Sequence, residues 1–137
     1  MRNAYRLNVI ADHDRKIIIF RVIGPMPSIE FAERLFETYE AMEAPWTYSR
    51  IMDFRRFEGL VDFTVVEDIA RRWAALCAGR MIHSRVAVIS LDALDRARVP
   101  AASPMFPNET ICHFSDYHEA MAWITSPDTG PAAKRSA

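Results

Sequence analysis

Runs of apolar residues predict five β-strands along this chain. In Tyr5 to Ile10 apolar and polar residues alternate, which is typical of a half-buried strand. Lys16 to Ile23 is almost wholly apolar and β-branched, which indicates a strand buried on most of both faces. The short link between them predicts an antiparallel hairpin. Three more strands are predicted, at Ser49 to Asp53, Arg85 to Ser90 and Thr110 to Phe114.

Apolar residues at helical spacing predict four helices. The first runs from Ser28 to about Met42, with an inward stripe made of Ile29, Ala32, Phe36 and Tyr39, widened by Phe31 and Leu35. The second runs from Thr64 to Ala78 and points inward with Val65, Val66, Ile69, Trp73, Leu76 and Cys77.

Capping residues and prolines predict where the helices begin and end. Thr64 and Glu67 have the spacing of a capping box at the start of the second helix. A third helix is predicted from Asp92 to Val99, ended by Pro100 and followed by an irregular loop at Ala101 to Asn108. Ser115 is expected to cap a last helix, which faces inward with Tyr117, Ala120, Met121 and Ile124.

The order of these elements predicts one α/β domain over residues 1–126, with a mostly parallel five-stranded sheet, an antiparallel edge strand and about four helices. The four helices could cover one face of the sheet or split between two. The strands at Lys16 to Ile23 and Arg85 to Ser90 are apolar on both faces, so something must cover the second face. Long side chains, an apolar ligand or a partner subunit in a two-fold homodimer could each do so. Residues 127–137 are small and polar, which predicts a disordered tail.

Composition excludes several classes of protein. Half of the 137 residues are hydrophobic, 26% are charged, and the net charge is −1, so nothing favours nucleic acid or an anionic membrane. No apolar run is long enough for stable membrane insertion, and the N-terminus does not resemble a signal peptide. Cys77 and Cys112 lie in apolar segments, which favours two buried thiols in a reducing cytoplasm over a disulfide.

The sequence contains no recognisable catalytic, metal or cofactor motif. The histidines, His13, His83, His113 and His118, fall in separate elements, whereas a metal needs converging ligands. Cys77 lies on an apolar helix face, where burial makes a thiol inert. No glycine-rich phosphate loop is present. These features favour a protein without enzymatic activity and without a cofactor.

The turn that follows the middle strand, Phe54 to Asp62, holds the densest polar cluster. Turns at the carboxyl edge of a sheet are exposed and often carry function. We expect a partner-binding surface here, together with the first turn of the second helix, formed by Asp53, Arg55, Arg56, Phe57, Glu58 and Asp62. The alternative is that the phenylalanines fold into the core and the charges pair among themselves.

Three stretches of the chain resemble the STAS domains, within them the SpoIIAA-like group, which is sometimes linked by fold to the lipid-binding Sec14 proteins. They are the opening hairpin that ends in Gly24, the segment IMDFRRFEG at 51–59, and the segment FSDYHEAMAWI at 114–124. The resemblance implies a SpoIIAA-like arrangement of β–α units and a role in regulation through a protein partner.

The resemblance also points to one candidate phosphoacceptor. In anti-sigma factor antagonists of this family, a serine that begins the second helix is phosphorylated within an Asp-Ser-Ser-Gly-like motif. The matching segment here is Val61-Asp62-Phe63-Thr64, which lacks both serines and the glycine. Only Thr64 could take that role, and as a helix cap it needs no such function.

Two functional hypotheses follow from the sequence. The first is a non-catalytic interaction or regulatory module with a protein partner that the sequence does not identify. The second is a protein that binds a small apolar molecule or lipid, with a pocket rimmed by apolar residues in loops and at element ends, namely Met26, Trp46, Met105, Phe106 and Trp123. Ordinary core packing would also explain these residues.

Overall fold

A computed structural model describes residues 4–80 and 84–127 of the chain. Its five strands form one sheet whose spatial order, β1-β2-β3-β4-β5, is also the order along the chain. Only the β1–β2 pair is antiparallel, and the other neighbours are parallel. The strands are β1 Arg6–Asp12, β2 Ile17–Gly24, β3 Ser49–Phe57, β4 Ser84–Ile89 and β5 Glu109–Phe114. The predicted mostly parallel sheet with an antiparallel edge strand is confirmed.

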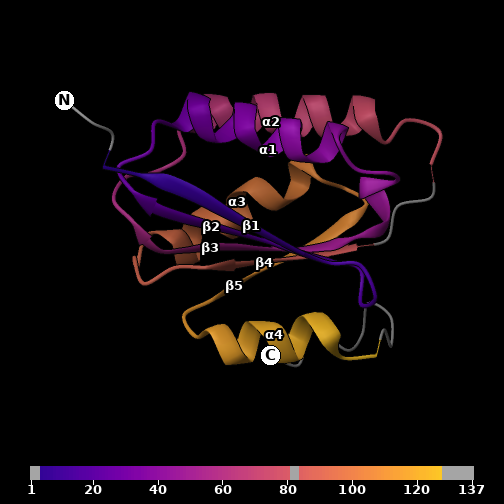
Figure 1. The fold of residues 1–137 in the computed structure, drawn as a ribbon. Helices are drawn as coiled ribbons and strands as arrows, with labels where there is room; N and C mark the ends of the chain where they lie inside the picture. The colour runs from indigo at the N-terminus through magenta and orange to yellow at the C-terminus, as the bar shows by residue number, and fades with distance from the viewer. Residues whose placement is uncertain (1–3, 81–83, 128–137) are drawn as a thin grey trace.

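The helices form two layers, one on each side of the sheet (Figure 1). A right-handed crossover to the next neighbouring strand always places its helix on the same face, so the connecting helices share one side. The helix that follows β5 connects no strands and lies on the opposite side (Figure 1). The helices are α1 Ser28–Glu40, α2 Phe63–Leu76, α3 Asp95–Ala102 and α4 Tyr117–Thr125, with short 3-10 turns η1 Pro45–Thr47 and η2 Ser103–Met105.

The sheet therefore separates two apolar cores. Phe20 and the other even-numbered residues of β2 pack toward α1 and α2, together with Trp73. Ile17, Ile19 and their neighbours on β3 and β4 pack against Ala120 and Ile124 of α4. The second face, for which the sequence left three coverings open, is thus covered by a helix of the same chain. This finding removes the reason for which we expected a homodimer, and the oligomeric state stays a prediction.

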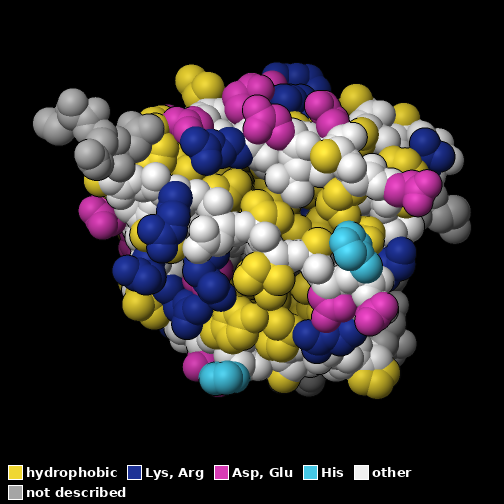
Figure 2. Space-filling view, in the orientation of Figure 1, with side chains coloured by type: hydrophobic (Ala, Val, Ile, Leu, Met, Phe, Trp, Pro, Cys, Tyr) yellow, Lys and Arg dark blue, Asp and Glu magenta, His cyan; other side chains and the backbone are white. Residues whose placement is uncertain are grey.

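The edge strand β1 is less covered than the rest. Val9 and Ile10 are exposed there, and Figure 2 shows hydrophobic side chains on this side of the molecule. Gly24 ends β2 in a left-handed conformation, with φ +83°, and a Cβ at this position would lie 2.2 Å from the backbone oxygen of Ala4. Only glycine fits this close approach of the two chain segments.

Several details of the helices differ from the sequence predictions. The inward stripe of α1 is confirmed except for Ile29, which is 70% exposed because it lies on the solvent side of the first turn. Thr64 does not cap α2: the helix begins at Phe63, and its N-cap residue is Asp62. The cap of α4 is Asp116, whose carboxylate accepts a hydrogen bond from the backbone N–H of Glu119, rather than Ser115.

The prediction that Pro100 ends the third helix is also wrong. α3 begins at Asp95 rather than Asp92, because the Asp92 carboxylate accepts a hydrogen bond from the backbone N–H of Leu94 and forms a turn there. Pro100 is the sixth of the eight residues of α3. Its ring removes the hydrogen bond that a backbone N–H there would donate to the carbonyl of residue 96, and the helix continues to Ala102. The predicted loop at Ala101 to Asn108 contains the end of α3 and η2.

None of the described helices is long and apolar enough to cross a membrane. The predicted tail begins at Pro127, and residues 128–137 lie outside the described residues, as does His83. The middle strand continues to Phe57, so the first four residues of the turn predicted at Phe54 to Asp62 belong to β3. The remaining predicted element bounds agree with the structure to within a few residues.

Candidate functional site

An apolar cavity of about 160 Å³ lies on the face of the sheet that carries α1, α2 and α3. Its floor is formed by side chains of β3, β4 and β5, and its walls by the helices and the β3–α2 loop. Apolar side chains make up most of the lining, including Phe31, Leu35, Met52, Phe54, Val66, Ile69, Trp73, Val86, Val88, Val99, Phe106 and Ile111. An apolar cavity of 150 Å³ in another protein stays dry and binds benzene, so this cavity can hold a group of at least that size.

The sequence of α3 explains why this space stays open. Alternate residues of the strands point to one face, which places Met52, Val86 and Ile111 under the cavity. α2 contributes Val66, Ile69 and Trp73. The eight residues of α3, DRARVPAA, include only one large apolar side chain, Val99, and the helix has no buried residue. α3 therefore lies beside β5 without filling the space between β5 and α2.

The inner end of the cavity holds a buried ion pair. The side chains of Arg50 and Glu109 are 3% and 2% exposed, and Nη2 of Arg50 contacts Oε2 of Glu109. Nη1 of Arg50 also donates to the backbone oxygen of Tyr48 at 3.1 Å, and the guanidinium lies 4.2 Å from the ring centre of Trp73. The hydroxyl of Ser84 donates to the same Oε2 atom at 2.9 Å. The pair is thus held in place by contacts from three strands and α2.

The other carboxylate oxygen of Glu109, Oε1, is buried and has no hydrogen-bond partner among the described residues. A buried acceptor without a partner is uncommon in proteins and needs an explanation. Glu109 lines the apolar cavity, and it also lines a second cavity of about 200 Å³ between the end of α2 and η2. Trp73 and Phe106 line both cavities as well, so Glu109 lies where the two adjoin.

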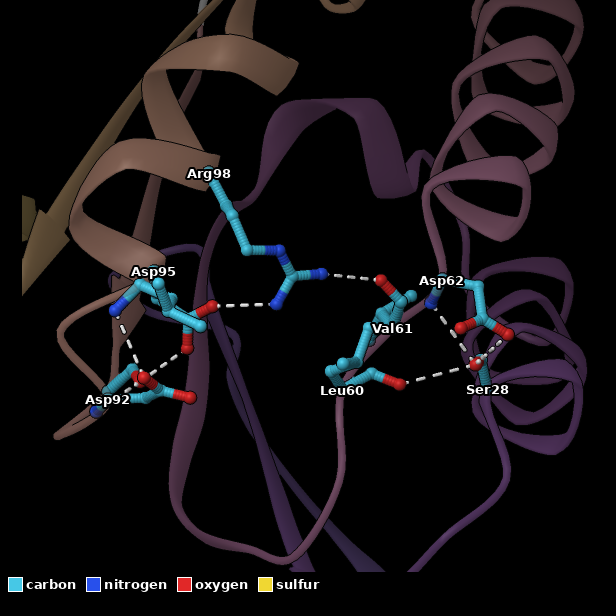
Figure 3. A network of polar contacts seen from close by, with 9 residues as sticks. Ser28, Leu60, Val61, Asp62, Asp92, Asp95 and Arg98 are labelled. Carbon is cyan, nitrogen blue, oxygen red and sulfur yellow. Dashed lines mark hydrogen bonds and ion pairs between the residues drawn. The ribbon is translucent and has the colours of Figure 1, made fainter.

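A chain of hydrogen bonds joins α3 to α1 at the carboxyl edge of the sheet (Figure 3). Nη2 of Arg98 donates to the backbone oxygen of Val61 at 2.7 Å, and Nη1 of Arg98 pairs with Asp95 at 2.9 Å. On the α1 side, the Ser28 hydroxyl donates to the backbone oxygen of Leu60 and accepts from the backbone N–H of Asp62. Arg98 and Asp95 line the cavity, so these contacts form part of its wall.

The predicted partner-binding residues do not form one surface. Asp53 is only 1% exposed, so it cannot itself contact a partner, and this part of the prediction is corrected. Its carboxylate accepts hydrogen bonds from Nε of Arg21 at 2.9 Å and from Nε and Nη2 of Arg55 at 2.9 and 2.8 Å. The Arg55 guanidinium lies 5.2 Å from the ring centre of Tyr117 on α4. Asp53 and Arg55 thus belong to the face opposite the cavity.

The remaining residues of the turn lie elsewhere. Phe57 is half-buried, packs against Phe54 and lines the cavity. Arg56, Glu58 and Asp62 are exposed, as is Thr64 in the first turn of α2. Partner binding by the exposed residues and phosphorylation of Thr64 stay predictions.

The thiols and histidines show no sign of a reactive site in the described part of the chain. Cys77 and Cys112 form no disulfide among the described residues, and burial raises the pKa of Cys77 to about 11, which keeps it protonated at neutral pH. Nδ1 of His13 lies 2.7 Å from the hydroxyl of Tyr48. Residues 4–80 and 84–127 contain no group of three potential metal ligands.

The charged residues at the cavity were not predicted from the sequence as site residues; they are Arg50, Asp95, Arg98 and Glu109. One signal was available for Arg50, which occupies an inward position in the alternation of β3, beside Met52 and Phe54. A charged side chain at such a position requires a partner. Its partner lies 59 residues away in sequence, and no local pattern identifies it.

We expect Asp53 to make the stability of the protein depend on pH. Burial alone would raise the pKa of Asp53, but hydrogen bonds from Arg55 and Arg21 outweigh it and hold this pKa below its ordinary value. Because the pKa of Asp53 is lower in the folded protein than in the unfolded chain, its ionised carboxylate stabilises the fold. This stabilisation is fully present above the unfolded pKa of about 3.9 and is lost as the pH falls through the folded pKa. Asp53→Asn should lower the free energy of unfolding by ~1–3 kcal/mol at pH 7, and this difference should shrink as the pH falls below 4.

Urea unfolding between pH 3 and pH 7 measures this difference. Asp68→Asn is the control, because Asp68 forms an exposed ion pair with Arg71 that should contribute only about 0–1 kcal/mol. A loss in Asp53→Asn that stays constant down to pH 3 would contradict the role of its charge.

Comparison with solved structures shows that this chain has a SpoIIAA-like fold. The chain is similar to the crystal structure of an uncharacterized protein from the DUF3478 family, with a SpoIIAA-like fold, from Shewanella loihica PV-4. The similarity covers 88% of this chain and 93% of that chain, with a TM-score of 0.58 and 16% sequence identity. No protein-family model and no curated protein matches the sequence. The fold that the resemblance implied is confirmed.

Proposed function

We propose that this chain is a non-catalytic module that binds a small, largely apolar molecule in the cavity between α2, α3 and the sheet. The cavity itself is the observation that carries the proposal: about 160 Å³ of space lined by apolar side chains. Ligand sites are typically concave and apolar, with a few polar groups that orient the ligand. Here the polar groups are the Arg50–Glu109 pair at one end and Arg98 with Asp95 at the other.

Two further observations support a binding role without catalysis. The buried carboxylate of Asp53 is fully engaged by two arginines, and the Cys77 thiol is buried and protonated. Neither group is poised to act as a nucleophile or a base.

Toluene and indole are suitable probes for this function. A ligand that binds only the folded state raises the melting temperature, so saturating probe should stabilise the wild-type protein measurably. Ala102→Phe should weaken probe binding about tenfold or more, because Ala102 lines the cavity and a benzyl group there occupies the space. Amide chemical-shift titration measures the affinity, and native mass spectrometry of the purified protein detects any molecule that co-purifies.

Ala101→Phe is the matched control. Ala101 is the preceding residue of the same helix and is exposed, so the same substitution there should leave probe affinity unchanged. The proposal fails if no probe shifts the melting temperature or any amide signal, or if both variants bind like the wild type.

A second candidate function is an interaction with a protein partner at the carboxyl edge of the sheet. Its support is a set of exposed apolar side chains at the β3–α2 and β4–α3 connections. Leu60, Leu91 and Leu94 in these loops are 54%, 68% and 68% exposed, and Phe63, the first residue of α2, is 54% exposed. Large exposed apolar side chains beside charged ones are common at interfaces. Two exposed charged residues lie next to this set: Arg56 near the end of β3 and Glu58 in the β3–α2 loop.

The double variant Arg56→Ala/Glu58→Ala tests this candidate. Both side chains are exposed, so folding stability should change by no more than ~0.5 kcal/mol. Capture of partners from the source cell's lysate should fall. The control is Asp14→Ala/Arg15→Ala, which also removes one acid and one base but lies in the β1–β2 turn at the opposite edge of the sheet. Equal capture by both double variants and the wild type would exclude the loop as a partner surface.

A further inference from the structure

The unpartnered oxygen of Glu109 specifies the chemistry of the bound molecule, if the cavity is a ligand site as proposed. Among the described residues, two buried side-chain atoms have no hydrogen-bond partner, Oε1 of Glu109 and Nε2 of His113. Glu109 lines the cavity, whereas His113 lines neither of the two cavities described above. Within residues 4–80 and 84–127, Oε1 of Glu109 is therefore the unpartnered buried acceptor whose residue lines the cavity.

No donor among the described residues reaches Oε1 of Glu109. Both donors from the protein, Arg50 Nη2 and the Ser84 hydroxyl, go to the other oxygen, Oε2. The carboxylate is buried, so the cost of leaving Oε1 without a hydrogen bond is high. The apolar side chains that make up most of the cavity lining have no donor to offer. A hydroxyl or N–H group on the bound molecule would remove this cost.

The charge of the site favours a neutral donor over an ion. Arg50 and Glu109 form a pair with no net charge, so an ammonium group beside it would add an uncompensated buried positive charge. A carboxylate has no proton to donate and would face the oxygen of Glu109. Transfer of either ion from water into this cavity is unfavourable for these reasons.

We infer that the molecule held in this cavity is apolar and carries a neutral hydrogen-bond donor, a hydroxyl or N–H group, that binds Oε1 of Glu109. Apolar molecules with a phenol, alcohol, indole or amide group belong to this class. Free fatty acids and aliphatic amines, which are ionised at neutral pH, do not.

Four probes of similar shape test this inference on the intact protein. Toluene carries no polar group, and p-cresol carries a neutral donor. Benzylamine carries a cation at neutral pH, and benzoate an anion. In a site without a free acceptor, the added hydroxyl of p-cresol would weaken binding relative to toluene, because the hydroxyl loses its hydrogen bonds to water. With Oε1 as acceptor, p-cresol should bind about tenfold tighter than toluene, and benzylamine and benzoate should bind more weakly than toluene. Amide chemical-shift titration at pH 7 measures all four affinities.

Two variants locate the effect. Glu109→Gln keeps the shape of the side chain but can place an amide N–H₂ where Oε1 was. The p-cresol hydroxyl could then only accept a hydrogen bond from a neutral amide, so its advantage over toluene should shrink. Ala102→Phe should abolish p-cresol binding if the hydroxyl reaches Oε1 from the first cavity. If p-cresol keeps its tenfold advantage in Ala102→Phe, the donor binds from the second cavity and the placement is wrong.

The outcomes separate this inference from the proposed function. If toluene binds as tightly as p-cresol in the wild type, the cavity is a ligand site but Oε1 does not select a donor, and the inference is overturned. Tight binding of benzylamine or benzoate overturns the preference for a neutral group. If none of the four probes binds, the proposed function fails and the inference fails with it. The wild-type series decides these points even if Glu109→Gln does not fold.

Discussion

Trp73→Ala is expected to lower the free energy of unfolding by about 3–5 kcal/mol, the usual cost of removing a buried tryptophan side chain. Trp73 is 5% exposed, its ring centre lies 4.7 Å from that of Tyr39, and the Arg50 guanidinium lies 4.2 Å from it. The substitution would enlarge the existing cavity and expose one face of the buried arginine to empty space. Urea denaturation followed by circular dichroism measures the loss.

Phe63→Ala is the matched control for this prediction. It also truncates an aromatic residue of α2, but Phe63 is 54% exposed, so the change should stay within ~0.5 kcal/mol. A loss below about 1 kcal/mol for Trp73→Ala would show that the side chain does not pack as described.

The second large effect concerns the buried ion pair. Arg50→Met would leave the Glu109 carboxylate buried without its partner, and such a change typically costs about 3–5 kcal/mol. The double variant Arg50→Met/Glu109→Leu removes both charges and keeps similar volumes, so it should recover most of this loss. A double-mutant cycle from chemical denaturation at pH 7 gives the coupling energy of the pair.

The exposed pair Arg71–Asp68, with side chains 72% and 38% exposed, is the comparison. Its coupling should be no more than about 1 kcal/mol. If the double variant of the buried pair is as unstable as Arg50→Met alone, the loss comes from packing of the arginine stem and not from an unpaired charge.

The strands and most of the buried residues could be predicted from the sequence, because burial leaves a local pattern. The continuous β-branched run of β2 indicated a strand covered on both faces, and both cores contact it. The helical spacing around Trp73 correctly indicated that this side chain is buried. These signals depend on neighbouring residues along the chain.

The site was much less predictable, since it depends on contacts between distant segments. Arg50 and Glu109 meet only because β3, β4 and β5 pair in parallel with one register. The turn after β3 looked like one surface, but Asp53 and Phe57 face different sides of the sheet. A register shift in the β2–β3 pairing, between Asp53 and Arg56, interrupts the regular alternation that would place both on one face. The cavity arises because the side chains of α3 do not fill the space between β5 and α2. An empty volume has no sequence pattern of its own.

The placement of α4 has a consequence for how the chain is made. Strand order follows chain order, so each β–α unit can dock on its predecessor as the nascent chain leaves the ribosome. The three connecting helices complete one core early, but the opposite core closes only when Tyr117–Thr125 emerges. Until then Ile17, Ile19, Ile51, Ala87 and Ile89 form a bare apolar sheet face. The incomplete nascent chain therefore exposes a hydrophobic surface that α4 later covers. Premature termination before this helix would leave a product prone to aggregation and degradation.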